Sequence, residues 1–171
     1  NCSLQQLLEH GFFHADPHPG NFLVDGEILC PLDFGCTKRI DNDFYTKNFH
    51  LLKPSLLEDR VGFSKALLAL GIILPSDSVA NREVIMETVL PSIELLARPF
   101  RSKTFDFGEE AFMKSIYELG EQNSQNKNLK ELRGQRGSPH SLYLNRSYFG
   151  LYSLLSRLRA KINPTVPRWI L

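Results

Sequence analysis

The spacing of apolar residues predicts a mostly helical chain with one short β-hairpin. Near the start, "SLQQLLEHG" places three leucines on one helical face, and Gly11 suits a left-handed C-terminal cap. The segments "FLV" and "EILCPLDF" are typical of two short strands, and the Asp25-Gly26 pair between them is a hairpin signal. The preceding "HADPHPGN" is predicted to be a loop, because its two prolines do not fit inside a helix.

Helical periodicity dominates the rest of the chain. Asp41 and Ser78 stand where they would start helices, Ser55 and Glu58 match a capping box, and Pro91 predicts a kink. The polar, glycine-containing "NSQNKNLKELRGQRGS" predicts an exposed, mobile loop. Helices are expected over about 41–52, 55–71, 78–96, 107–122 and 141–162.

Composition narrows the class of protein only modestly. The 171 residues suggest one domain with a real core, and a net charge of +1 gives no reason to expect nucleic acid as a partner. The three cysteines lack zinc spacing and fit a reducing intracellular compartment, so Cys30 and Cys36 are predicted to be free thiols, with Cys30 facing the core. The longest apolar run is too short to cross a bilayer. The first residue is Asn, so further sequence is expected upstream.

Polar residues around the predicted hairpin match the spacing of a phosphoryl-transfer site. His14, Asp16 and Asn21 stand at the offsets of the kinase catalytic loop, and Asp-Phe-Gly follows from Asp33 across the hairpin. In that pattern Asp16 accepts or orients the proton of the attacking hydroxyl. Asn21 and Asp33 supply oxygen ligands to magnesium ions bound to the ATP phosphates. The hairpin is expected to bring Asp33 back beside Asn21, so the three side chains should converge on one surface.

Neighbouring residues are predicted to support this site. His18 occupies the place of a kinase lysine, where it could donate a hydrogen bond to the transferred phosphate. His14, together with Phe34 and Gly35 of the Asp-Phe-Gly run, is expected to hold the loop rather than to react. A purely structural alternative, in which Asp16 and Asn21 only cap a turn, is disfavoured because the two motifs occur together.

The run "GFFHADPHPGNFLV" followed by "LDFG" closely resembles the UbiB/AarF-like atypical kinases, the coenzyme Q kinase-like proteins. Ala15 in place of Arg and the Pro-His-Pro-Gly run single out this family. The resemblance is sharp over residues 4–40, and "NRSYFGLYSLLSRL" loosely fits the family's C-terminal part. It implies a kinase-like fold, binding of ATP with Mg²⁺, and a role in ubiquinone or related isoprenoid-quinone biosynthesis. It also implies an ATPase or small-molecule kinase rather than a general protein kinase.

The predicted fold class is therefore α+β and mostly α-helical, a protein-kinase-like C-terminal lobe with one small hairpin. Residues 1–171 would form a partial domain, with the catalytic loop and Asp-Phe-Gly at 14–35 and a helical remainder at 41–162. The N-terminal lobe is expected to be absent, since neither the family's Lys-x-Gly-Gln nor a phosphate-covering loop is found. The chain would be a fragment or a degraded relative, inactive alone, from bacterial cytoplasm or an organelle matrix.

Two alternatives stay open at this stage. Aminoglycoside and choline phosphotransferases use a similar loop and a following metal-binding Asp. A noncatalytic module is the other, because the last helix carries basic residues beside an apolar stripe that could meet a membrane surface or a quinone-precursor lipid. Ordinary packing of this stripe is favoured. The stripe comprises Leu151, Leu154, Leu155, Leu158 and Ile162, and a second apolar group, expected in the core, comprises Phe105, Phe107, Phe112 and Tyr117.

Overall fold

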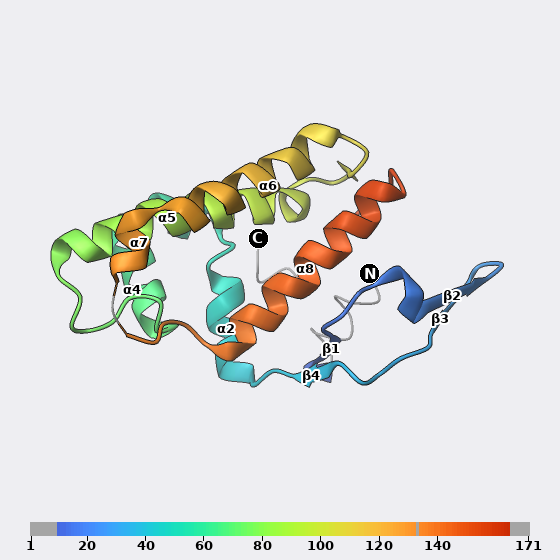
Figure 1. Cartoon of the computed structure of the whole chain (residues 1–171), viewed down its shortest axis with the longest axis horizontal. Coiled ribbons are helices and arrows are strands. Elements are labelled where there is room, and N and C mark those ends of the chain that lie inside the picture. The colour runs from blue at the N-terminus through green and yellow to red at the C-terminus, as the bar shows by residue number, and fades with distance from the viewer. Residues whose placement is uncertain (1–9, 133, 165–171) are drawn as a thin grey trace.

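The computed structural model describes residues 10–132 and 134–164, and it confirms a mostly helical α+β fold (Figure 1). The helices are α2 (Asn42–His50), α3 (Pro54–Glu58), α4 (Arg60–Ala69), α5 (Val79–Ala97), α6 (Glu110–Gln125), α7 (Lys127–Glu131) and α8 (Pro139–Arg157). The strands are β1 (Phe12–His14), β2 (Phe22–Asp25), β3 (Ile28–Pro31), β4 (Thr37–Arg39), β5 (Phe105–Asp106) and β6 (Lys161–Ile162). Two 3₁₀ turns, η1 (Pro19–Asn21) and η2 (Arg98–Arg101), complete the described elements. The helix expected before Gly11 lies largely outside the described residues.

The strands form three antiparallel ribbons, whereas the sequence predicted a single hairpin. The predicted hairpin is β2–β3, and Asp25 pairs with Ile28 so that Gly26 and Glu27 make the turn. Gly26 has φ of +58°, a left-handed value that costs glycine little. The ribbons β1–β4 and β5–β6 join segments far apart in sequence, which local patterning does not reveal. The β1–β4 pairing closes the loop that carries both motifs.

The expected helix over 55–71 is two helices, which corrects the predicted capping box. Pro54 starts α3 at a position where its missing N–H is not needed, and Ser55 makes no cap. Asp59 then adopts an extended backbone, and its carboxylate accepts a hydrogen bond from the Gly62 N–H at 3.0 Å to begin α4. The other two predicted caps are confirmed: Asp41 caps α2 and Ser78 caps α5.

The segment 123–138 was predicted to be an exposed, mobile loop; most of its described residues are exposed, but much of it is helical, so the loop prediction was wrong. Its first part extends α6, and Asn126 caps the short helix α7. Its last part is fixed by Arg136, whose guanidinium donates to both carboxylate oxygens of Asp77 at 2.6 and 2.7 Å and to the Ile72 carbonyl at 3.1 Å. Long-range pairing of this kind overrides the local polarity on which the prediction rested.

Two buried clusters form the core. The larger lies among β1, α2, α4 and α5, and includes the fully buried Leu67 and Ile73. The smaller is aromatic: Phe105, Phe107 and Phe112 pack edge to face with ring centroids 4.8 to 5.9 Å apart. These three were correctly predicted to be in the core, whereas Tyr117 is 57% exposed.

Helix α8 connects the helical layer to the strands. It lies beside α6 (Figure 1). It supplies Tyr152 to the aromatic cluster and Leu144 to the larger one. It ends at Arg157, earlier than expected, because Arg159 turns the chain with φ of +48° toward β6. The predicted apolar stripe is therefore divided. Leu155 and Ile162 pack against the aromatic cluster, whereas Leu151, Leu154 and Leu158 line a cavity beside the hairpin.

The β2–β3 hairpin extends away from the helices (Figure 1). Cys30 lies on it and is only half-buried, so the prediction that Cys30 faces the core was wrong. The cysteine that packs against the larger cluster is Cys36. Both thiols are free, as predicted. Among the described residues, no helix combines the length and apolar character that crossing a bilayer requires.

Candidate functional site

The motif loop begins where β1 ends, at His14. Ala15 follows and donates its N–H to the Cys36 carbonyl at 2.9 Å, which continues the β1–β4 pairing by one residue. Its side chain is fully buried. An arginine, the usual kinase residue at this position, would bring a charge and a long side chain into that space, so the packing accounts for the alanine.

Asp16 and Asn21 are joined directly. The Asn21 amide nitrogen donates to the Asp16 carbonyl oxygen at 3.0 Å and to a carboxylate oxygen of Asp16 at 3.3 Å. Between them the chain turns tightly: the His18 N–H bonds to the Asp16 carbonyl at 2.7 Å, and the Asn21 N–H to the His18 carbonyl at 2.9 Å. The two prolines of this turn occupy positions where no N–H is needed, so the loop holds a fixed shape.

His14 links this loop to the Asp-Phe-Gly run. Its Nδ1 accepts the Asp16 N–H at 3.2 Å, so Nε2 carries the hydrogen and donates to the Asp33 carbonyl oxygen at 2.6 Å. One imidazole therefore fixes the backbone on both sides of the site. The ring also packs against Phe22 at the start of the hairpin.

The second motif lies exposed after β3. The Leu32 N–H donates to the Asn21 carbonyl at 2.9 Å, which places Asp33 one residue beyond the partner of Asn21. One carboxylate oxygen of Asp33 accepts the Gly35 N–H at 2.7 Å, and Phe34 is 63% exposed. Within the described part of the chain, the Asp33 carboxylate makes no hydrogen bond to Asp16 or Asn21. The backbone brings the motifs together, and convergence of the three side chains stays a prediction.

His18 has a local role in this geometry. Its Nδ1 accepts the Gly20 N–H at 3.1 Å and caps η1, while the imidazole is exposed. Its Nε2 is left pointing away from that cap and has no described hydrogen bond.

Sequence reasoning missed Arg146, which lies on α8, 130 positions from Asp16. Its guanidinium donates to the Asp16 carboxylate at 2.9 Å. This hydrogen bond, more than the opposing desolvation, lowers the pKa of Asp16 below its usual value. Four residues on, Gly150 faces the loop: a Cβ placed there would lie 2.8 Å from the Pro17 ring. The signal available was the Arg-x-x-x-Gly spacing in "NRSYFGL", which puts both residues on one face of a helix.

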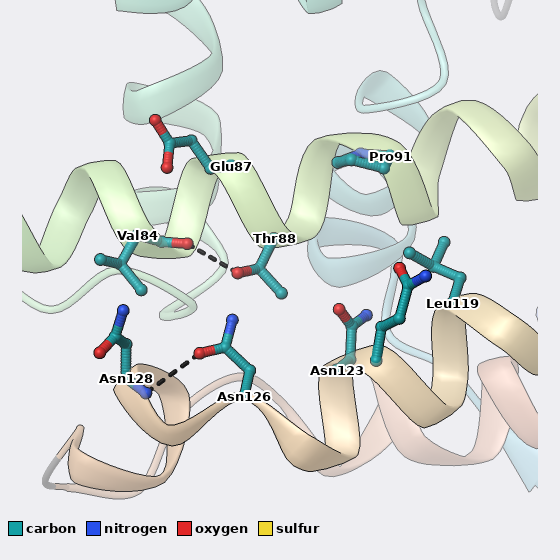
Figure 2. Close-up of a pocket in the computed structure, with 9 residues that line it drawn as sticks. Val84, Glu87, Thr88, Pro91, Leu119, Asn123, Asn126 and Asn128 are labelled. Carbon is teal, nitrogen blue, oxygen red and sulfur yellow. Dashed lines mark hydrogen bonds between the residues drawn. The ribbon is translucent and has the colours of Figure 1, made fainter.

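Several hollows lie on the described surface. One, about 960 Å³, is apolar and is lined by β1, the hairpin and the α8 leucines. A smaller one, about 310 Å³, lies between the Asp16–Pro19 loop and α8. A third, about 280 Å³, is lined by neutral amides from α6 and α7 and by Thr88 and Glu87 of α5 (Figure 2). The third contains none of the motif residues, so the first two are the ones relevant to the predicted chemistry.

The donor set suits a hard divalent cation only in combination with other ligands. The described residues include no cluster of three His, Cys, Asp or Glu side chains able to hold a metal. Asn21 uses its amide nitrogen on Asp16, and Asp33 uses one carboxylate oxygen on Gly35, so each keeps an oxygen uncommitted. Two such oxygens fit magnesium that is bound largely by phosphates and water.

Comparisons with known proteins give matches that cover the motif region. The family model for the ABC1 atypical kinase-like domain matches residues 1–67. The chloroplast protein ACTIVITY OF BC1 COMPLEX KINASE 3 of Arabidopsis thaliana is 72% identical over 36 residues, which are 20% of this chain and 5% of that protein.

Longer matches extend over the helical part. An uncharacterized protein of Synechocystis is 33% identical over 111 residues, 62% of this chain and 19% of that protein. The mitochondrial atypical kinase COQ8 of Saccharomyces cerevisiae is 26% identical over 168 residues, 94% of this chain and 31% of that protein. The chain thus spans less than a third of each of these relatives. With the ABC1 match lying over the His14–Gly35 motifs, the chain belongs to the UbiB/AarF-like atypical kinase family.

Proposed function

We propose that this chain forms the metal-binding and catalytic-loop half of a Mg²⁺- and ATP-dependent atypical kinase or ATPase. The observation that carries the proposal is the His14 bridge, which ties the Asp16 backbone to the Asp33 backbone at 3.2 and 2.6 Å. A single rigid connection between the two motifs is what phosphoryl transfer requires, because that reaction depends on positioning and charge neutralisation more than on covalent help.

Each of the motif residues would have its own role in the reaction. Asp16, kept ionised by Arg146 and oriented by Asn21, holds the hydroxyl of the acceptor or of water. As the acceptor oxygen bonds to the γ-phosphorus, the bond from that phosphorus to the β,γ-bridging oxygen breaks and ADP leaves. The acceptor proton passes to Asp16 and then to solvent. Asn21 and Asp33 would hold magnesium, which supplies charge neutralisation for the phosphates.

We further propose that the pathway served is the synthesis of ubiquinone or a related isoprenoid quinone. This finer statement rests on the family resemblance and is supported by the large apolar cavity, whose lining would suit a quinone-precursor lipid. Two relatives carry mitochondrial or chloroplast names, which supports an organelle matrix or a bacterial cytoplasm as the place of action.

The 171 residues should bind nucleotide weakly by themselves. The Lys–Glu pair and the phosphate-covering loop of kinases are not recognisable in this sequence, and the Asp33 carboxylate is exposed to water. Water screening weakens each charge interaction, so we expect a dissociation constant for Mg²⁺-ATP in the millimolar range, on the order of −4 kcal/mol.

Paramagnetic NMR tests the proposal at this affinity. We expect Mn²⁺-ATP to broaden the amide resonances of Asp16, Asn21 and Gly35 in the ¹⁵N-labelled chain. Asp33→Asn should abolish the broadening, whereas Asp25→Asn, an exposed carboxylate on the same hairpin, should keep it. Equal broadening in wild type and Asp33→Asn would refute the metal assignment. Micromolar binding by this chain would refute the expectation that it lacks part of the nucleotide site.

A further inference from the structure

The 310 Å³ pocket between the loop and α8 has an unusual lining for so small a hollow. One wall is the loop from Asp16 to Pro19, and the other is the α8 face that carries Arg146, Gly150 and Arg157. Because Asp16 lies in this wall, a molecule bound here would meet the carboxylate to which we assign the acceptor hydroxyl.

Positive charge in the pocket exceeds negative charge. Asp16 is the one carboxylate among its lining residues, and Arg146 already pairs with it. Arg157 lies three turns along the same helix, is exposed, and has no ion-pair partner among the described residues. His18 adds an imidazole on the facing wall. An uncommitted guanidinium in a hollow of this kind is suited to an anionic group, which it can bind with two parallel hydrogen bonds.

The rest of the lining leaves room for an apolar body beside Arg157. Ser153 lines the pocket one turn before Arg157, but its hydroxyl oxygen is shielded from solvent and does not face the hollow. The remaining walls are apolar: Phe149, Leu154 and the ring of Pro17.

From these features we infer that the pocket binds the acceptor, and that the acceptor is an organic anion with a carboxylate or phosphate group on a compact apolar body. The anionic group pairs with Arg157, and the apolar body lies against Phe149 and Leu154. The assignment of a bound molecule as acceptor rests on the proposed function, whereas the binding itself does not. Arg146 stays on Asp16 and acts as a positioning residue.

Small aromatic probes test the inference without knowledge of the natural acceptor. Benzoate and phenyl phosphate carry the two candidate anionic groups, and benzamide is the neutral counterpart of benzoate. In NMR titrations of the 171-residue chain, we expect both anions to shift the resonances of Gly150 and Ser153 saturably. Benzamide should bind at least about tenfold more weakly, since a charged hydrogen bond is lost. The tighter anion would identify the group that the pocket prefers.

The variants separate the pocket from general surface charge. Arg157→Gln should weaken the binding of the tighter anion about tenfold. Arg101→Gln, an exposed arginine of η2 outside the pocket, should leave it unchanged. The inference is overturned if neither anion binds saturably, if benzamide binds as well as benzoate, or if Arg157→Gln has no effect. Failure of the proposed function would show instead as loss of the Asp33-dependent Mn²⁺-ATP signal, so the two failures are distinguishable.

Discussion

The β2–β3 hairpin of the motif region and the helical body differ sharply in the exposure of their apolar side chains. In the body, Leu67, Ile73 and Phe112 are at most 1% exposed. In the hairpin, Val24 and Ile28 are 67% and 63% exposed. The body is held together by packing of its apolar side chains. The hairpin is held chiefly by its backbone hydrogen bonds and by the His14 bridge.

This difference places stability and chemistry in separate parts of the molecule. Burial of apolar area stabilises the body, and it gives the hairpin little. The loop gains its fixed shape instead from the ladder β1–β4 and from α8, which contacts it through Arg146, Ser147 and Gly150. Changes in the hairpin should therefore affect binding more than folding, and changes in the body the reverse.

A pair of identical substitutions should give the largest contrast. Leu67→Ala leaves a cavity among fully buried neighbours and should lower the free energy of unfolding by about 3 kcal/mol. Leu29→Ala removes a side chain that is already 52% exposed and should cost no more than about 1 kcal/mol. Urea denaturation followed by circular dichroism measures both. Equal losses would show that the hairpin is as integral to the fold as the body.

The partly buried ion pair between Arg136 and Asp77 in the body should give the next largest effect. Asp77 has a side chain only 4% exposed, and the hydrogen bond from Arg136 lowers the pKa of Asp77 to about 2. Asp77→Asn leaves the Arg136 charge without its carboxylate and should cost on the order of 3 kcal/mol at neutral pH.

The pH dependence of this effect has a defined sign. Because the pKa of Asp77 is lower in the folded chain than its ordinary 3.8, the pair stabilises the fold above about pH 4. This stabilisation is lost as the pH falls from about 4 to about 2. The difference in unfolding free energy between wild type and Asp77→Asn should shrink over that range. A difference that stays constant from pH 6 to pH 2 would contradict the role of the ion pair.

Some features of these two regions could be predicted from the sequence. The hairpin, the caps at Asp41 and Ser78, and the aromatic core follow local rules of turn chemistry and periodicity, and the structure has them all. The family motif likewise lies within one short run of the chain. These features depend on neighbours in sequence, so a single sequence contains the information.

Features that depend on distant neighbours could not be predicted. Arg136 lies in a polar segment with a loop-like composition, and its partners Ile72 and Asp77 lie 64 and 59 positions away. The ribbons β1–β4 and β5–β6 consist of two or three residues per strand, too short for periodicity to register. The Arg-x-x-x-Gly spacing places Arg146 and Gly150 on one helical face, but only the tertiary packing of α8 against the loop brings Arg146 to Asp16. The motif residues of the site could therefore be predicted from the sequence, but most of the contacts that hold them in place could not.

The smallest effect concerns the contact between α8 and the loop that carries Asp16. Two helical glycines provide a matched test of this contact. At Gly120 on α6 an added Cβ would meet no atom within 4 Å, so Gly120→Ala should stabilise the chain by about 0.5 to 1 kcal/mol through helix propensity. Gly150 on α8 is equally helical, yet a Cβ there would lie 2.8 Å from the Pro17 ring. Gly150→Ala should lose that gain and destabilise by about 1 kcal/mol, because the loop must move away from α8. It should also shift the amide resonances of Asp16 and His18 and lengthen the Arg146–Asp16 contact, whereas Gly120→Ala should leave them in place. If both substitutions stabilise the chain equally, α8 and the loop are not in the close contact that Gly150 permits, and the positioning role of Arg146 fails with it.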